Sequence, residues 1–273
     1  MSQINKVYYN IDSNFNKKIL LLTDIHYYSK KNIKKLNKIL DVIEDNIDYI
    51  CISGDFIDCG KVKDYELFIE WLDKLSKKAL VLISLGGHDI ISTHKDKTYY
   101  YNEELYNDIK KLKNVKLLDN TTYEDGNIRF IGLTLPLDYY YKYNENRNYF
   151  KRFINNTFGV YKNKYNILLC HTPINITNYN EDDINLFNCI DMTLCGHMHA
   201  GIVPKFLRKI FKGRGIFSPA GNGMFPKDAY GYIKNKRNNI IISSGVTKAS
   251  NSNPFKFTDI FFDVELTYIN IRK

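Results

Sequence analysis

The sequence predicts an α/β protein in which two mixed sheets pack together and helices flank them. Two observations lead to this prediction. Up to about residue 113, short apolar runs alternate with longer segments of helical periodicity, whereas later strand-like runs follow one another with few helices between them. Since every sheet must bury a face against another layer, strands without intervening helices favour a second sheet stacked on the first.

The first part of the chain is typical of a βαβαβ unit. Strands are expected at 18–23, 49–53 and 79–85, and helices at 33–47, 65–77 and about 102–113. In the first helix, apolar residues such as Ile33, Leu36 and Ile43 recur at spacings of three and four, which leaves Lys, Asn and Asp on the opposite face. The strands, by contrast, are short continuous apolar runs.

The second part is rich in strand-like runs. They are expected at 115–118, 121–124, 128–133, 167–170, 192–195 and 240–243, and in the alternating stretch 258–271. The Tyr-rich stretch 139–152 is a candidate for a long surface loop or lid.

Composition narrows the class of protein. With 273 residues and 44% hydrophobic content the chain can fill one large core, and we expect a single domain over residues 1–273. The opening 18 residues lack the apolar run of a secretory signal, and no later stretch approaches the ~18 apolar residues of a membrane span, so we expect a cytoplasmic location. The five cysteines form no Cys-x-x-Cys pair, which indicates neither a disulfide framework nor a zinc ribbon.

Potential metal ligands follow four separate strand-like runs. Asp24 and His26 follow the first run, Asp55 follows the second, His171 follows 167–170, and His197 and His199 follow 192–195. His88 follows the third run, so five of the six histidines stand just after a strand, and only His94 does not. Because the carboxyl ends of strands joined by crossovers lie along one edge of a sheet, these side chains are expected to converge on one crevice.

Imidazoles combined with carboxylates suit Mn, Fe or Zn better than Ca or Mg. A carboxylate such as Asp55 can bridge two ions, and two ions roughly 3.5–4 Å apart can activate a water molecule and clamp phosphoryl oxygens. Each piece alone has an ordinary explanation, since Asp55 could be a turn residue and His171 a core histidine. Together they predict hydrolysis of a phosphate ester at a dinuclear metal site.

The order of these motifs resembles the calcineurin-like metallophosphoesterase superfamily, over roughly residues 20–201. The motifs are Asp24-Ile25-His26, Gly54-Asp55 followed by Asp58, Gly86-Gly87-His88-Asp89, His171 and Gly196-His197-Met198-His199. The last of them continues into Ala200-Gly201, which is similar to a bacterial subgroup with Gly-His-x-His-x-Gly. The resemblance implies a four-layer α/β/β/α sandwich.

The resemblance also implies roles for these residues. Asp24, His26 and His199 would hold one metal, His171 and His197 the other, and Asp55 would bridge the two. His88 would be catalytic near the leaving-group oxygen, and Asp58 would orient it.

One position departs from the family pattern. The family normally has Asn where this chain has Gly87, and the Asn carbonyl ligates the second metal. Three explanations stay open. Water or a neighbouring group takes the position of the Asn ligand, or the second ion is weakly bound, or the site has lost some or all of its activity. We predict a normal first metal site and a labile second one.

The net charge of +9 favours phosphorylated, nucleic-acid or anionic-membrane partners, although a solvated Lys-rich surface explains it as well. In segment 203–215, Phe206, Leu207, Ile210 and Phe211 share one face of an expected helix, with basic residues around the rest. Such a segment can lie on an anionic membrane as a peripheral anchor, or it can pack on the domain as an ordinary helix.

Three functions therefore stay open at this stage. The first is a phosphomonoesterase or phosphodiesterase that acts on a small or lipid-linked phosphate. The second is a binding or scaffold protein with a weakened metal site, which Gly87 favours. The third is a nucleic-acid phosphodiesterase, which the charge favours but which lacks an evident aromatic-basic stacking platform.

Overall fold

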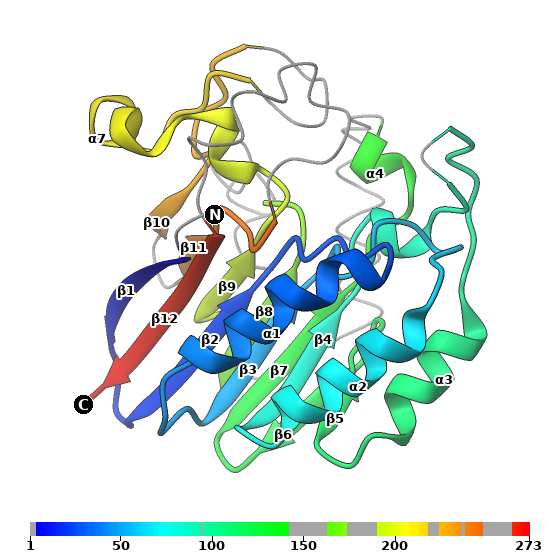
Figure 1. Cartoon of the computed structure of the whole chain (residues 1–273). Coiled ribbons are helices and arrows are strands. Elements are labelled where there is room, and N and C mark those ends of the chain that lie inside the picture. The colour runs from blue at the N-terminus through cyan, green and yellow to red at the C-terminus, as the bar shows by residue number, and fades with distance from the viewer. Residues whose placement is uncertain are drawn as a thin grey trace.

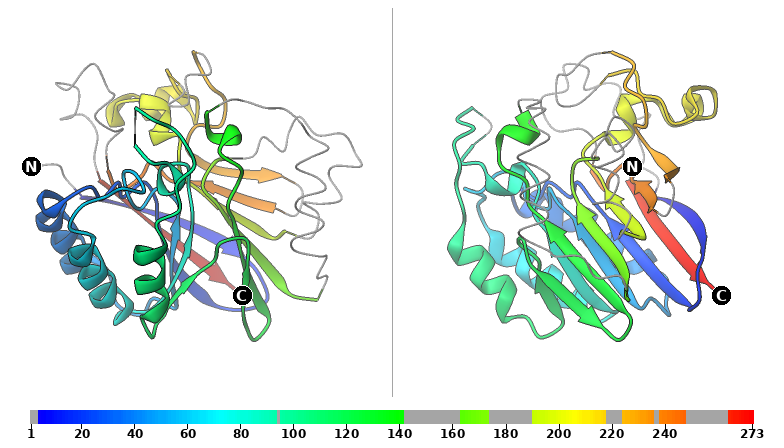
Figure 2. Two further views of the ribbon diagram at one scale, coloured as in Figure 1. Left: turned by 90° about the vertical axis from the view of Figure 1, so that its right-hand side faces the viewer. Right: turned by 180° about the vertical axis from the view of Figure 1, so that it is seen from behind.

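The computed structural model describes residues 4–93, 95–141, 163–173, 190–217, 224–235, 238–247 and 264–273. Two six-stranded sheets lie face to face (Figures 1 and 2). Across the first sheet the strands are β1 (Ile4–Asp12), β12 (Val264–Arg272), β2 (Lys17–Leu22), β3 (Tyr49–Ser53), β4 (Leu80–Ser84) and β5 (Val115–Leu117). Across the second they are β10 (Gly231–Asn235), β11 (Asn238–Ile242), β9 (Met192–Cys195), β8 (Tyr165–Cys170), β7 (Ile128–Leu133) and β6 (Thr122–Asp125). Each sheet has parallel and antiparallel pairs, which confirms the predicted α/β fold with two mixed sheets.

Three amphipathic helices cover the outer face of the first sheet: α1 (Ile33–Val42), α2 (Tyr65–Ser76) and α3 (Glu103–Lys111) (Figure 1). Each helix buries apolar side chains spaced three or four residues apart, such as Leu36 and Ile39 in α1. The Trp71 indole of α2 donates a hydrogen bond to the Leu36 carbonyl at 2.9 Å, which joins the two helices. Within the described ranges no helix covers the outer face of the second sheet, and none is long and apolar enough to cross a membrane.

Helix α1 ends at Val42 instead of continuing to residue 47, as the sequence had predicted. The backbone of Ile43 is extended, with φ −63° and ψ 130°, so the helical hydrogen bonding stops there. Ile43 and Ile47 are nevertheless buried in the core. Their apolar spacing reflects burial of the connection to β3, which periodicity alone cannot distinguish from a helix.

Alternate side chains of the strands fill the space between the sheets. Leu21 of β2 belongs to a cluster that includes Phe130 and Leu169 of the second sheet, whereas Leu20 belongs to the cluster beneath the helices. Both faces of β2 are therefore buried. This explains why its sequence is a continuous apolar run instead of an alternating one.

The sequence does not predict two edge strands, β1 and β10. β1 pairs in parallel with β12 from Ile4 to Asp12, and β10 pairs antiparallel with β11. Both strands lie at the edge of a sheet and keep exposed side chains, Tyr8 in β1 and Tyr232 in β10. Edge strands of this kind show no continuous apolar run, and their position depends on partners elsewhere in the chain. The expected strand 258–271 corresponds to β12, and residues 258–263 lie outside the described ranges.

The loops that carry the predicted ligands meet at one end of the molecule. β2, β3 and β4 are parallel neighbours in the first sheet, as are β8 and β9 in the second, so their carboxyl ends lie along shared edges. The hydroxyl of Ser53, at the end of β3, donates to the Leu194 carbonyl of β9 at 2.7 Å and links the two edges. The backbone N–H of Asp24 donates to the Gly54 carbonyl at 3.2 Å, which joins the loops after β2 and β3.

Substitution of Leu21 by Ala is expected to lower the free energy of unfolding by roughly 2–5 kcal/mol, because it leaves a cavity between the sheets. The matched control is Leu117→Ala in edge strand β5, where the side chain is only half-buried and the loss should be smaller. Urea unfolding followed by circular dichroism measures both variants. Equal losses at the two positions would contradict the packing described for the inter-sheet core.

Candidate metal centre

Every predicted site residue lies in a loop that follows a strand. Asp24 and His26 follow β2, Asp55 and Asp58 follow β3, His88 follows β4, His171 follows β8, and His197 and His199 follow β9. Their side chains form three groups, two of which share His26, and in each group the potential ligand atoms lie within 4.8 Å of one another. The groups are Asp24–His26–His199, Asp55–His171–His197 and His26–Asp58–His88. The structure thus brings all the predicted site residues together, whereas His94 lies outside the described residues.

The backbone is left-handed at five of these positions. The φ angles are 52° at Asp24, 47° at His26, 51° at Asp55, 67° at His197 and 43° at His199. Residues other than glycine rarely adopt this region, and those that do gather at functional sites. The strands therefore end abruptly at the ligands, and the tight turns hold the ligand side chains at the edge of the sheets.

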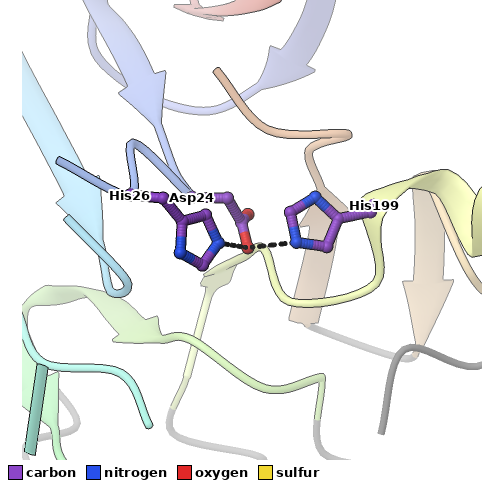
Figure 3. Close-up of side chains that lie close together, drawn as sticks. All are labelled: Asp24, His26 and His199. Carbon is purple, nitrogen blue, oxygen red and sulfur yellow. Dashed lines mark ion pairs between the residues drawn. The ribbon is translucent and has the colours of Figure 1, made fainter. Parts of the chain in front are cut away.

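The first group surrounds the fully buried carboxylate of Asp24. Its Oδ1 lies 3.4 Å from His199 Nε2 and 3.9 Å from His26 Nε2. Figure 3 shows the two imidazoles reaching this oxygen from opposite sides, on loops far apart in the sequence. The backbone N–H of His197 also donates to both carboxylate oxygens at 3.2 Å, so Asp24 is held in place from the loop after β9.

Ring nitrogens of this group are buried without hydrogen bonds. Within the described part of the chain, neither Nε2 of His26 nor Nδ1 of His199 has a hydrogen-bond partner. An unbonded buried nitrogen is rare, because it has lost its water without replacement. A divalent ion between these imidazoles and Asp24 would give His26 Nε2 its missing interaction and would meet His199 through Nε2, the ring nitrogen that faces Asp24. The donor set suits Mn, Fe or Zn. The residues present therefore fit a metal.

The second group is centred on Asp55. Its Oδ2 lies 2.8 Å from Nε2 of His171, whose Nδ1 donates to the Ser53 carbonyl at 2.9 Å. This second contact is typical of metal-binding histidines, since it fixes the tautomer and turns Nε2 toward the centre. The ring of His197 lies edge-on to that of His171, with centroids 5.2 Å apart. The groups adjoin, because Asp24 Oδ1 is 3.8 Å from His171 Nε2.

Burial and neighbouring charges set the protonation of the centre. Burial disfavours the charged form of Asp55, yet His171 and His88 hold the pKa of its carboxyl well below the usual value. Burial lowers the pKa of His197 to about 3 and that of His88 to about 4. Although burial opposes it, Asp55 raises the pKa of His171 to about 10. The imidazoles of His88 and His197 therefore favour the neutral form, which is the form that ligation by His197 requires.

Asp58 contacts the two histidines beside it through different groups. His88 Nδ1 donates to the backbone carbonyl of Asp58 at 2.9 Å. The carboxylate of Asp58 lies 3.4 Å from His26 Nδ1 and 3.9 Å from His88 Nδ1. The backbone of Asp58 thus orients His88, and its side chain lies nearer to His26. The catalytic roles given to His88 and Asp58 stay predictions.

Asp89 is a site residue that the sequence suggested only as part of the motif Gly86-Gly87-His88-Asp89. Its buried carboxylate accepts hydrogen bonds from the backbone N–H groups of Asp55, Ile57 and Gly86, at 2.8, 3.0 and 2.7 Å. Burial and the neighbouring Asp55 raise the pKa of Asp89 to about 8. Asp89 thereby holds the loops after β3 and β4 together.

Tyr140 was not expected at the site. It lies in α4 (Asp138–Tyr141), at the start of the expected lid 139–152, of which residues 142–152 fall outside the described ranges. A Cβ atom at Gly87 would meet Cβ and Cγ of Tyr140 at 2.9 Å. Gly87 has an ordinary helical backbone, with φ −64°. Space, and not backbone conformation, therefore requires glycine at this position.

The Tyr140 ring is held in that place. Its hydroxyl accepts a hydrogen bond from the Leu135 N–H at 3.1 Å and donates to the Leu85 carbonyl at 3.4 Å. Its ring centroid lies 6.2 Å from that of His171 and 6.4 Å from that of His197. Tyr140 thus lies beside the second group and fills the space that a side chain at position 87 would need.

The chain matches the family model described as calcineurin-like phosphoesterase over residues 17–201. A comparison with curated proteins found no match. Among solved structures, it is similar to the phosphopantetheinyl hydrolase of Mycobacterium tuberculosis, with 11% identity, 84% of this chain and 90% of that chain covered, and a TM-score of 0.44. It is also similar to a purple acid phosphatase from yellow lupin, with 12% identity, 85% of this chain and 44% of that chain covered, and a TM-score of 0.42. A third similar structure is the NAD nucleotidase of Haemophilus influenzae, with 16% identity, 86% of this chain and 46% of that chain covered, and a TM-score of 0.43.

This chain spans less than half the length of the lupin and Haemophilus chains. At these identities and TM-scores nothing about activity follows from the three structures. The family match is different, because residues 17–201 contain every side chain of the three groups and the strands that these side chains follow. The bacterial subgroup with Gly-His-x-His-x-Gly stays a prediction. The match establishes that this chain belongs to the calcineurin-like phosphoesterase family, and the buried centre supplies the cluster of candidate ligands that a metal-dependent phosphoester hydrolase needs.

Proposed function

We propose that the protein hydrolyses a phosphate mono- or diester at a centre that holds two metal ions. The observation that carries this proposal is the adjoining pair of ligand groups, which meet where Asp24 Oδ1 and His171 Nε2 are 3.8 Å apart. Asp24, His26 and His199 would hold one ion, His171 and His197 the other, and Asp55 would lie between them. Ions bound there would lower the pKa of a water molecule and polarise the phosphoryl oxygens.

His88 is the residue that we propose acts on the substrate. Its side chain is 19% exposed, whereas those of Asp55 and His171 are almost completely buried. Its backbone N–H donates to Asp55 Oδ1 at 2.9 Å, which fixes the residue at the rim of the centre. Burial makes the imidazole neutral, but the negative charge of a phosphate ester would favour its protonated form. A protonated His88 would then stabilise charge or donate a proton at the leaving-group oxygen.

The second ion is proposed to be labile. Gly87 supplies no side-chain ligand, and the adjacent space is occupied by Tyr140. The second group therefore keeps one carboxylate and two imidazoles, without the amide oxygen usual in the family. Losing a neutral ligand lowers metal affinity more than it disturbs the fold.

Gly87 also favours a second candidate, a scaffold protein with an impaired centre. All the other expected ligands and His88 are nevertheless present and lie close together. A centre without a catalytic function would have no need to keep buried imidazoles near carboxylates, because unsatisfied buried polar groups destabilise the fold. The hydrolase is therefore the better-supported proposal.

Chelator-treated protein is expected to be inactive on a panel of phosphate mono- and diesters, and Mn, Fe or Zn should restore phosphate release. Asp55→Asn should lower that activity by at least ~100-fold, since it removes the charge between the two groups. Asp108→Asn on the surface of α3 is the matched control and should be unaffected. If the parent protein released no phosphate with any metal, the scaffold proposal would replace the hydrolase.

His88→Asn is expected to lower kcat by roughly 10²–10⁴-fold, because it removes the group that would act at the leaving oxygen. Its metal content should stay that of the parent, as His88 is not among the proposed ligands. Steady-state kinetics and elemental analysis of the same preparation measure the two quantities. A parallel loss of metal and activity would show that His88 is a ligand instead.

Gly87→Asn alone is expected not to strengthen the second site, because its Cβ would collide with Tyr140. The double substitution Gly87→Asn with Tyr140→Gly removes both the Cβ and the ring of Tyr140, which opens the space, and should raise the metal retained after dialysis toward two ions per chain. The parent and Tyr140→Gly alone should retain about one ion, since neither gains a ligand. Elemental analysis after extensive dialysis measures this. A parent that keeps two full equivalents would contradict the labile second site.

A further inference from the structure

The segment that follows the metal-binding loop carries a group of exposed apolar side chains. Among the described residues, nine large hydrophobic side chains are exposed, and four of these are tyrosines elsewhere on the surface. The other five lie between residues 206 and 225: Phe206 (67% exposed), Ile210 (73%), Phe217 (44%), Met224 (62%) and Phe225 (58%). Unlike tyrosines, these five have no hydroxyl that water could bind. We call residues 206–217 and 224–227 the apical surface.

The apical surface is not the single amphipathic helix that the sequence suggested. A 3-10 turn, η5 (Lys205–Leu207), leads into one short helical turn, α7 (Arg208–Phe211), which ends at Lys212 in a left-handed conformation. Leu207 and Phe211 are half-buried, as in an ordinary packed helix. Phe206 and Ile210 instead face outward, so packing on the domain accounts for only half of the apolar residues.

Basic side chains accompany the exposed apolar ones. Lys209, Lys212, Arg214 and Lys227 are all exposed, and Asp228 is the one exposed acidic residue among residues 206–217 and 224–228. Arg208 has a different position. It is half-buried and donates to Ser244 Oγ at 2.8 Å and to Glu265 Oε2 at 3.3 Å, so it anchors the segment to the fold.

The apical surface is joined to the metal-binding loop through the backbone. The N–H groups of Ile216 and Phe217 both donate to the Gly201 carbonyl, at 2.8 and 3.0 Å, two residues beyond the predicted ligand His199. A Cβ atom on Gly201 would come within 2.2 Å of Gly215 Cα, so the two strands of chain are in direct contact. Phe225 N–H donates to the Ile216 carbonyl at 2.9 Å, which holds the second apolar stretch beside the first.

This surface projects from the end of the molecule where the ligand loops lie. Figure 1 shows α7 beyond the carboxyl ends of the strands, on the side of β10 and β11, and the views of Figure 2 place it at the same end. A flat partner that met α7 would therefore approach the molecule from the end that holds the metal centre.

We propose that the apical surface binds an anionic lipid bilayer, with its apolar side chains in the headgroup region and its lysines against the lipid phosphates. Apolar residues flanked by basic ones are the composition that favours such an interface over water. The bilayer would then present a lipid-linked or membrane-proximal phosphate ester to the centre. That last step rests on the proposed hydrolase, whereas membrane binding itself does not.

The test is co-sedimentation of the whole protein with vesicles of phosphatidylcholine alone or mixed with phosphatidylserine. Binding is expected only to the mixed vesicles, and it should weaken as salt is added, because the lysine contacts are screened. Ile210→Glu with Met224→Glu, and separately Lys209→Glu with Lys212→Glu, should each reduce binding at least ~10-fold. Tyr99→Glu, at an exposed apolar position remote in the sequence, is the control and should bind normally.

Metal content and circular dichroism of the variants should match those of the parent, so that loss of binding cannot be ascribed to misfolding. Hydrolysis of a water-soluble ester should be unchanged in the variants, while hydrolysis of a phosphate ester embedded in mixed vesicles should fall with binding. Absence of binding to mixed vesicles at low salt would overturn the inference and leave the hydrolase intact. Vesicle binding without hydrolysis of any ester would support the membrane inference and count against the proposed hydrolase function.

Two other occupants give distinct results. Concentration-dependent dimerisation that the Ile210→Glu and Met224→Glu pair abolishes, without vesicle binding by the parent, would assign the surface to a second copy of the chain. Binding of single-stranded nucleic acid that the lysine variants abolish, again without vesicle binding, would assign it to nucleic acid. Either result would overturn the membrane inference.

Discussion

The geometry of the centre depends on the buried carboxylate of Asp89. Three backbone N–H groups, those of Asp55, Ile57 and Gly86, donate to it from the loops after β3 and β4. A carboxylate buried without such partners would be costly, so these loops can adopt few other conformations. The same loops carry Asp55 and His88. The positions of Asp55, the proposed bridging ligand, and of His88, the proposed catalytic histidine, therefore depend on the hydrogen bonds that Asp89 accepts.

Near Asp89, the negative charges of two buried carboxylates are stabilised by the imidazoles around them. Asp24 and Asp55 are buried, and each keeps its charged form because protonatable rings lie close by. The arrangement leaves ring nitrogens of His26 and His199 without hydrogen bonds in the described chain. Without a cation, such a cluster keeps buried negative charge and unbonded ring nitrogens, both of which are unfavourable. This is the physical reason to regard it as a metal centre and not as a structural network.

Two features lie beside the centre. Tyr140 occupies the space that a side chain at Gly87 would need, so the missing ligand at position 87 and the position of Tyr140 are linked. On the other side, the chain beyond His199 turns outward and exposes residues such as Ile210 and Met224. The first feature bears on the affinity for the proposed second ion, and the other on the proposed membrane contact.

The two-sheet class and the residues at the strand ends could be predicted from the sequence, because apolar periodicity and the residues just after a strand are local properties. The same local pattern predicted Asp24, Asp55, His171 and the pair His197 and His199 as neighbours. Three features appear only in the folded chain: Tyr140 fills the space beside Gly87, the Asp58 backbone orients His88, and β1 and β10 complete the sheet edges. Each of them depends on which distant segments of the chain meet, and no local sequence pattern carries that information.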